Sequence, residues 1–143
     1  MKKLFLLLFL ALSLFAEQGK EMIQAQILEK IFQNIEINKE IILWSDNKTL
    51  LKEFEKKGRL KTADDCREAT LLIVEQTKNL PKQLCQKAVF VLDYTLLKEI
   101  PESFGSMFWK KGRPNVVLIE SRLKLHEIKI SQELEMYVEE KIW

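Results

Sequence analysis

Apolar residues recur along the chain with two different periods, which separate the expected helices from the expected strands. Isoleucines spaced four residues apart between residues 21 and 37 predict a helix with one apolar face. Residues 48–57 predict a second helix, which follows the capping side chains of SDN and ends at Gly58. The run EIILW (40–44) indicates a buried strand. The runs TLLIVE (70–75) and AVFVLD (88–93) do not alternate, which is typical of strands covered on both faces.

Strands that alternate with helices predict an α/β domain with a mainly parallel sheet. A short edge strand is expected at 59–63. The C-terminal part differs, because GSMFW (105–109) and NVVLI (115–119) are separated by too few residues for a crossover and should form an antiparallel hairpin. A short helix at 120–127 and a terminal helix at 131–143 should follow. We therefore expect one three-layer α/β/α domain with a mixed, mainly parallel sheet and a C-terminal antiparallel hairpin.

The first sixteen residues predict a secretory signal peptide. Two lysines precede a twelve-residue apolar run, and Ala16 is a small residue at the cleavage position. This run is shorter than the roughly 18 residues that a membrane-spanning helix needs. We therefore expect an exported, periplasmic protein in which residues 17–143 form a single domain. An uncleaved N-terminal anchor is the alternative.

Removal of the signal peptide changes the net charge of the chain. The whole sequence has 23 basic and 21 acidic residues, and two of the lysines lie in the signal peptide. The exported part would then carry equal numbers of both signs. A neutral, mixed surface argues against nucleic acid as a partner, because binding phosphates requires a cationic face. The composition leaves a protein partner open.

The sequence contains no recognisable catalytic constellation. His126 is the only histidine, and no nucleophile motif accompanies it. The glycines match neither the spacing of a phosphate-binding loop nor that of a dinucleotide fingerprint. Two cysteines and one distant histidine fall short of the usual ligand set of a metal site. We expect a protein without enzymatic activity, cofactor or metal.

The two cysteines, Cys66 and Cys85, each precede one of the apolar runs expected to form strands. If these two strands are parallel neighbours, both thiols reach the same edge of the sheet. An oxidising compartment favours a disulfide there, which would stabilise the fold by about 3 kcal/mol. Two unpaired thiols are the alternative.

Polar side chains follow three of the expected strands, at the edge where open α/β sheets bind ligands. They could line a crevice for a small solute. The alternative is that Ser45, Asp46 and Asp93 cap the helices that follow, because the first backbone N–H groups of a helix need acceptors. The candidate ligand-binding residues are Ser45, Asp46, Thr77, Asp93 and Tyr94.

The turn of the expected hairpin, KKGRPN, combines cations with a glycine that permits positive φ and a proline that removes a backbone donor. Successive strand residues point to opposite faces, so one of Phe108 and Trp109 should face the core and the other should be more exposed. An exposed aromatic side chain beside Lys111 and Arg113 has the composition of a protein-interface hot spot. A solvated turn with one aromatic side chain packed below a helix is the alternative.

The order of motifs between residues 69 and 138 resembles a known family. Two apolar strands are followed by a hairpin entered at Gly105 and turned at Gly112–Arg113, then by NVVLIESRL, and then by Ile130–Ser131 with Leu134. This order is similar to that of the YfiR/HmsC-like family of periplasmic proteins. The N-terminal helix and the signal peptide also fit the layout of that family.

The resemblance implies a small α/β regulator, often dimeric and without enzymatic activity. Such a protein would bind the periplasmic part of an inner-membrane diguanylate cyclase and hold it inactive. It would use the hairpin face for contact and Cys66–Cys85 as a redox-sensitive disulfide. Our first hypothesis is therefore a regulatory module that binds a protein through Phe108, Trp109, Lys111 and Arg113, and our second is a small solute-binding protein.

Overall fold

The computed structural model describes residues 19–81 and 87–143. It begins with a helix over residues 19–33. In chain order, the other helices and strands are β1 (Ile35–Glu36), β2 (Ile42–Ser45), α2 (Lys48–Lys57), β3 (Lys61–Thr62), β4 (Leu71–Val74), β5 (Ala88–Val91), α3 (Leu96–Glu99), β6 (Ser103–Lys110), β7 (Arg113–Ile119), α4 (Glu120–Leu125), β8 (Lys129–Ile130) and β9 (Val138–Glu139). Three 3₁₀ helices are interspersed in this part of the chain: η1 (Cys66–Glu68), η2 (Thr77–Asn79) and η3 (Gln132–Tyr137).

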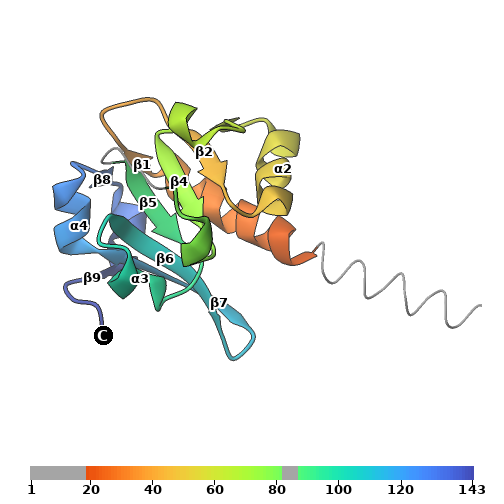
Figure 1. Cartoon of the computed structure of the whole chain (residues 1–143). Coiled ribbons are helices and arrows are strands. Elements are labelled where there is room, and N and C mark those ends of the chain that lie inside the picture. The colour runs from red at the N-terminus through yellow and green to blue at the C-terminus, as the bar shows by residue number, and fades with distance from the viewer. Residues whose placement is uncertain (1–18, 82–86) are drawn as a thin grey trace, which may run out of the picture.

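Within the described residues, seven strands form one mixed sheet in the order β3-β2-β4-β5-β6-β7-β9 (Figure 1). Neighbours from β3 to β6 are parallel, β6 and β7 are antiparallel, and β9 runs parallel to β7. β1 and β8 form a small antiparallel pair of their own. The α/β fold with a mainly parallel sheet and a C-terminal hairpin is therefore confirmed.

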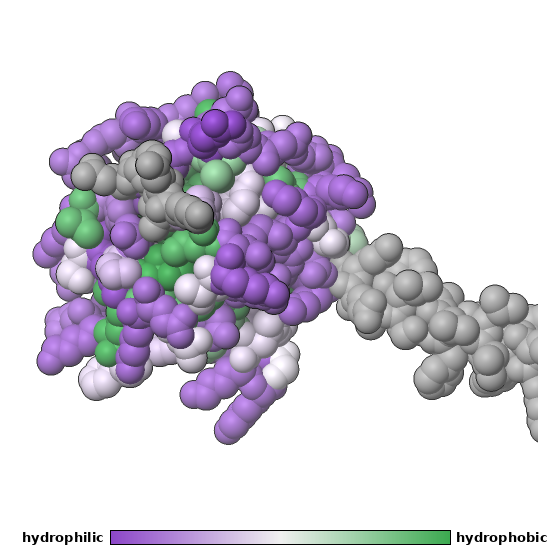
Figure 2. Space-filling view, in the orientation of Figure 1, coloured by the Kyte–Doolittle hydropathy of each residue, from purple (hydrophilic) through white to green (hydrophobic). Residues whose placement is uncertain are grey.

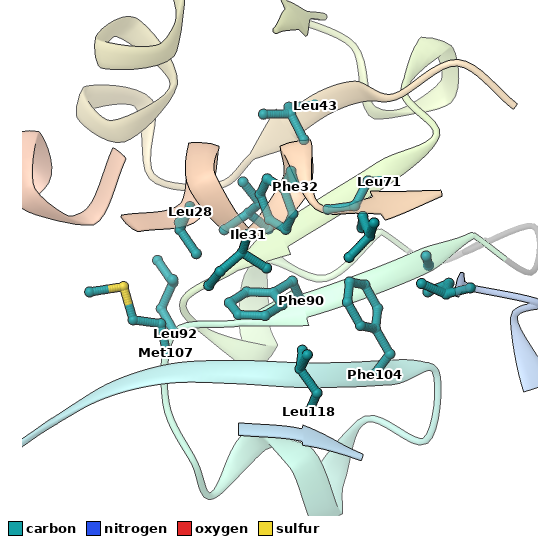
Figure 3. Close-up of a cluster of buried hydrophobic side chains, with 14 of the residues drawn as sticks. Leu28, Ile31, Phe32, Leu43, Leu71, Phe90, Leu92, Phe104, Met107 and Leu118 are labelled. Carbon is teal, nitrogen blue, oxygen red and sulfur yellow. The ribbon is translucent and has the colours of Figure 1, made fainter. Parts of the chain in front are cut away.

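The sheet has an apolar cluster on each face. On one face the N-terminal helix and α2 pack over the strands, with Phe32 edge-on to Phe90 at 5.5 Å between ring centroids (Figure 3). On the other face the cover is thinner, because Leu96, Leu97 and neighbouring residues come from the short α3 and its turns. No helix within the described residues has the length and hydropathy to cross a membrane.

Local signals explain the bounds of α2. Asn47 caps its first turn, since its side chain accepts a hydrogen bond from the backbone N–H of Leu50. Gly58 ends it in the left-handed conformation, with its own N–H donated to the carbonyl of Phe54. Both ends agree with the predicted helix over residues 48–57.

The structure corrects the predicted bounds of the first helix, which ends at residue 33 rather than 37. The side chain of Asn34 donates to the carbonyl of Lys30 at 2.7 Å, and its own carbonyl accepts from the backbone N–H of Ser131 at 2.9 Å. Ile35 then pairs with Ile130 in the small β1–β8 sheet. A distant segment therefore satisfies the backbone where the apolar period alone predicted more helix.

The terminal helix predicted for residues 131–143 is wrong. This segment forms η3 and then β9, whose Val138 pairs with Leu118 of β7. Leu134 is its one residue in the main core, whereas Met136 is 79% exposed and Tyr137 is 37% exposed. The open edge of β7 offers backbone partners that a helix could not use, so pairing overrides helical periodicity here.

Candidate interaction surface

The β6–β7 hairpin extends beyond the rest of the sheet. The pairing of β5 with β6 stops at Val91 and Ser106, whereas the pairing of β6 with β7 continues to Lys110 and Arg113. Residues 107–116, here called the arm, therefore project past the carboxyl ends of the parallel strands (Figure 1). The arm is the most protruding candidate for contact with a partner.

The tip of the arm is a two-residue turn. Lys111 has φ 52° and Gly112 has φ 73°. Two successive positive φ values are typical of the type I′ turn, whose twist matches that of the two strands. The predicted role of Gly112 is confirmed, but the positive φ of Lys111 was not visible from the sequence because lysine is not a residue that favours it.

The two aromatic residues of the arm point to opposite faces, as predicted. Phe108 packs edge-on against Tyr94 at 5.2 Å between ring centroids, and Tyr94 in turn accepts a hydrogen bond from the backbone N–H of Trp143 at 2.8 Å. Trp109 is 36% exposed and lies directly across from Pro114. Phe108 therefore anchors the arm to the body, and Trp109 is the aromatic residue available to a partner.

The arm carries positive charge only. Lys110, Lys111 and Arg113 are all exposed, and none of them forms an ion pair with any described residue. No acidic residue occurs in the sequence between Glu102 and Glu120. Figure 2 shows hydrophilic side chains at the tip, at the bottom of the view. The arm therefore presents an exposed tryptophan beside three cations, and none of these cations forms an ion pair with a described residue.

At the carboxyl ends of the strands, Asp46 is engaged with the chain itself. Its Oδ1 accepts the backbone N–H of Glu75 at 2.8 Å, and its Oδ2 accepts the backbone N–H of Gln76 at 3.0 Å. Asp46 therefore ties β2 to the turn after β4 and does not cap α2. Asn47 caps that helix instead. Asp46 accepts backbone N–H groups, as a capping residue would, but these groups belong to the segment after β4 and not to α2.

The other four candidate ligand-binding residues also have partners in the chain. Ser45 is buried, and its Oγ accepts the N–H of Asn47 at 3.0 Å. Thr77 donates its hydroxyl to Glu99 at 2.9 Å. Asp93 accepts the N–H and hydroxyl of Thr95 at the start of α3, at 3.1 and 3.0 Å, and Tyr94 belongs to the aromatic stack below the arm. Ser45, Thr77, Asp93 and Tyr94 are therefore engaged within the chain rather than free for a solute, although Asn47 is the residue that caps α2 and α3 has no side-chain cap.

Sequence reasoning missed a hollow at the opposite, amino-end edge of the sheet. A groove of about 580 Å³ there is lined by Thr70, Lys87, Glu102 and His126, among others. The ring Nε2 of His126 lies 2.8 Å from the carbonyl of Glu102 and therefore carries the proton, since a carbonyl can only accept. The Thr70 hydroxyl donates to the carbonyl of Glu40 at 2.6 Å. Within the described lining, these contacts do not form a nucleophile–base pair.

Cys66 lies half-buried in η1 at the same amino-end edge. The Lys87 ammonium donates to the carbonyls of Cys66 and Arg67 at 2.6 and 2.8 Å. Leu71 of β4 pairs with Ala88 of β5, so the segments that precede both strands reach one edge, as expected. Cys85 lies outside the described residues, and the Cys66–Cys85 disulfide stays a prediction. No cluster of three or more metal-ligating side chains occurs among the residues described.

Comparisons with protein-family models and with curated proteins gave no match to this chain. The similarity to the YfiR/HmsC-like family therefore stays a prediction from the motifs of residues 69–138.

Proposed function

We propose that this protein is an exported, periplasmic, non-enzymatic regulator that binds an inner-membrane signalling protein through the arm. The observation that carries the proposal is Trp109, which is 36% exposed on a projecting hairpin. Beside it lie three exposed cations without an ion-pair partner among the described residues. Tryptophan and arginine are the residue types most enriched among interface hot spots.

The arm is also held in one shape before it binds. The Phe108–Tyr94 contact fixes its base, the type I′ turn fixes its tip, and Pro114 fixes one φ angle in between. A preorganised element loses less conformational entropy on binding, so more of the contact energy appears as affinity. The similarity to the YfiR/HmsC-like family adds the class of partner, the periplasmic part of a diguanylate cyclase.

A capture experiment with two matched variants tests this proposal. The exported protein is tagged and used to capture partners from periplasmic and membrane fractions, alongside Trp109→Ala/Arg113→Ala. The control is Trp143→Ala/Lys98→Ala, which removes a tryptophan that is 78% exposed and an exposed cation of α3, both outside residues 107–116. We expect an inner-membrane signalling protein to be captured by the wild type and the control but lost with the arm variant. Identical partner profiles for all three proteins would end the proposal.

The alternative function is a small solute-binding protein that uses the strand carboxyl-end crevice. Its candidate residues already hydrogen-bond or stack with neighbours, so a solute would have to displace these contacts. A thermal-shift screen separates the two functions, because a solute at 100 times its Kd adds about 2.7 kcal/mol of stability.

A further inference from the structure

The end of the arm is a continuous exposed surface. We call residues 109–114 the apex, and all six of them are exposed. In chain order they are tryptophan, two lysines, glycine, arginine and proline. The apex therefore combines three cations with one large aromatic side chain and one proline, and it contains no acidic residue. Because the arm projects past the body, the apex can reach a flat surface while the rest of the domain stays in water (Figure 1).

The two faces of the apex differ in chemistry. Trp109 lies directly across from Pro114, so these two side chains share one face of the hairpin. Lys110 lies across from Arg113, so these two share the other face, and Lys111 lies in the turn. Tryptophan is enriched where an apolar layer meets water, because its ring is apolar and its N–H is polar. Long cationic side chains beside it can bend toward the polar side of such a boundary.

No carboxylate close to the apex competes for its cations. The neighbouring acidic residues in the sequence, Glu102 and Glu120, are at least seven residues from the cations, which is roughly 20 Å or more along extended strands. Salt screens charges over about 8 Å at physiological ionic strength, so these two glutamates have little influence. Asp93 follows β5 at the base of the arm, where it accepts hydrogen bonds from Thr95. The three cations are therefore available to an external anionic surface.

We propose that the apex binds reversibly to the surface of an anionic phospholipid bilayer. The cations contact the phosphate groups of the lipids, and the ring of Trp109 enters the headgroup layer. Each cation close to an anionic bilayer strengthens binding about fivefold, so three cations together contribute roughly 100-fold. One aromatic side chain with a few cations holds a protein reversibly and does not anchor it permanently. The inference rests on the proposed function, which places the arm beside an inner-membrane partner and hence beside a bilayer.

The bilayer contact gives the regulator a route to its partner. A protein held by its apex searches for an inner-membrane protein in two dimensions instead of three. Trp109 and the cations cannot contact lipid and protein at the same time, so they exchange one for the other when the partner is met. The contact with lipid is therefore an encounter step that precedes the contact with the signalling protein.

Co-sedimentation with vesicles tests this contact in the purified exported protein. Anionic vesicles of phosphatidylethanolamine with phosphatidylglycerol are compared with vesicles of phosphatidylcholine, which has no net charge. The arm variant is Lys111→Gln/Arg113→Gln. The matched control, Lys30→Gln/Lys52→Gln, removes the same charge from exposed lysines outside the arm. Thermal melts establish that each variant is folded, and binding by any other part of the chain is common to the arm variant and the control.

We expect the wild type and the control to bind the anionic vesicles, with an affinity that falls as salt rises. The arm variant should bind roughly 30-fold more weakly, since it lacks two cations worth about fivefold each. The wild type should bind phosphatidylcholine roughly 100-fold more weakly than the anionic vesicles. Inorganic phosphate at matched ionic strength should leave the protein on the vesicles, because a small anion offers no layer for Trp109.

Tryptophan fluorescence reports whether Trp109 itself enters the headgroup layer. The chain also contains Trp44, which is 8% exposed, and Trp143, which is 78% exposed. The probe protein is therefore Trp143→Phe, whose emission should move to shorter wavelength when anionic vesicles are added. The double variant Trp109→Phe/Trp143→Phe should show no such change, because the remaining tryptophan is already buried.

Five results would each overturn the inference. These are no binding by the wild type, equal binding to both kinds of vesicle, equal binding by the arm variant and the control, displacement by inorganic phosphate, and no emission change from Trp109. The vesicles contain no protein, so any of these results leaves the proposed function standing. Vesicle binding without capture of an inner-membrane protein would instead remove the proposed function and leave the lipid contact.

Discussion

Replacing Gly105 with alanine should destabilise the fold, because the hairpin is packed against this position from three sides. A β-carbon there would lie 2.8 Å from Cδ2 of Leu118, 2.8 Å from the carbonyl oxygen of Val117 and 3.0 Å from a ring carbon of Phe90. The Val117 oxygen belongs to the backbone of the paired strand, and the Leu118 and Phe90 side chains are completely buried. None of the three neighbours can move away cheaply.

Two opposing effects set the size of the change. Overpacking a tight core costs about 1–3 kcal/mol, and the fixed carbonyl puts this site near the upper end. Replacing glycine with alanine also restricts the unfolded chain, which stabilises a protein by about 0.4–1 kcal/mol. The overpacking term is larger, so we expect a net loss of about 2 kcal/mol. For a domain of this size that corresponds to a fall in Tm of about 8 °C.

Thermal unfolding followed by circular dichroism measures this effect, with guanidinium unfolding as a check on the free energy. Gly19→Ala is the matched control, because Gly19 lies in a helix with nothing within 4 Å of the added atom. The control should keep or slightly raise the Tm, since alanine is the better helix former. If Gly105→Ala were as stable as the wild type, the close approach of β6 and β7 described here would be incorrect.

Three further predictions each test one substitution. Arg122→Met should lower the free energy of unfolding by about 3 kcal/mol, because the carbonyls of Leu97 and Ser103 lose a charged donor. In the wild type, Nη1 of Arg122 lies 2.6 Å from the Leu97 carbonyl and 2.9 Å from the Ser103 carbonyl. A denaturant midpoint close to that of the wild type would contradict this prediction. Lys111→Asn should raise the free energy of unfolding by about 0.5–1 kcal/mol, because asparagine tolerates the positive φ of a type I′ turn. Calorimetry measures the shift in Tm, and a lower Tm would refute the turn assignment. Hydrogen bonds from Arg67 lower the pKa of Asp65 from 3.8 to about 2. The pair therefore stabilises the fold above about pH 3.8 and loses this effect as the pH falls toward 2. NMR titration of Asp65 should find the lowered pKa, and Arg67→Gln should return it toward 3.8.

The parallel strands and the hairpin could be predicted because their signals are local. Continuous apolar runs at 70–75 and 88–93 identify buried strands, and the observed β4 and β5 are buried at every position. The short connection at residues 110–114 excludes a crossover, which leaves only an antiparallel return. The alternation that separates Phe108 from Trp109 follows from strand geometry alone. The hairpin that forms the arm, and the opposite orientations of its two aromatic residues, could therefore be predicted from the sequence.

The C-terminal segment could not be predicted, because its structure depends on a distant edge. Helical periodicity at residues 131–143 competes with an unpaired stretch of β7, and nothing in the segment itself indicates that Val138 will pair with Leu118. The end of the first helix has the same cause, since Asn34 bonds to Ser131 almost a hundred residues later. Periodicity describes an isolated segment, and both errors occur where a non-local backbone partner is present.

The charge pattern illustrates the same limit at the level of function. The whole chain has 23 basic and 21 acidic residues, which predicts a mixed surface and argues against nucleic acid as a partner. The topology places the three exposed cations of the arm at one end of β7 and the exposed glutamates of residues 133–140 beside its other end, so a nearly neutral protein has an edge with two oppositely charged ends. Electrostatic attraction between surfaces depends on local charge rather than on the total. A neutral composition therefore excludes a uniformly cationic face but leaves room for specific contact through a locally charged surface.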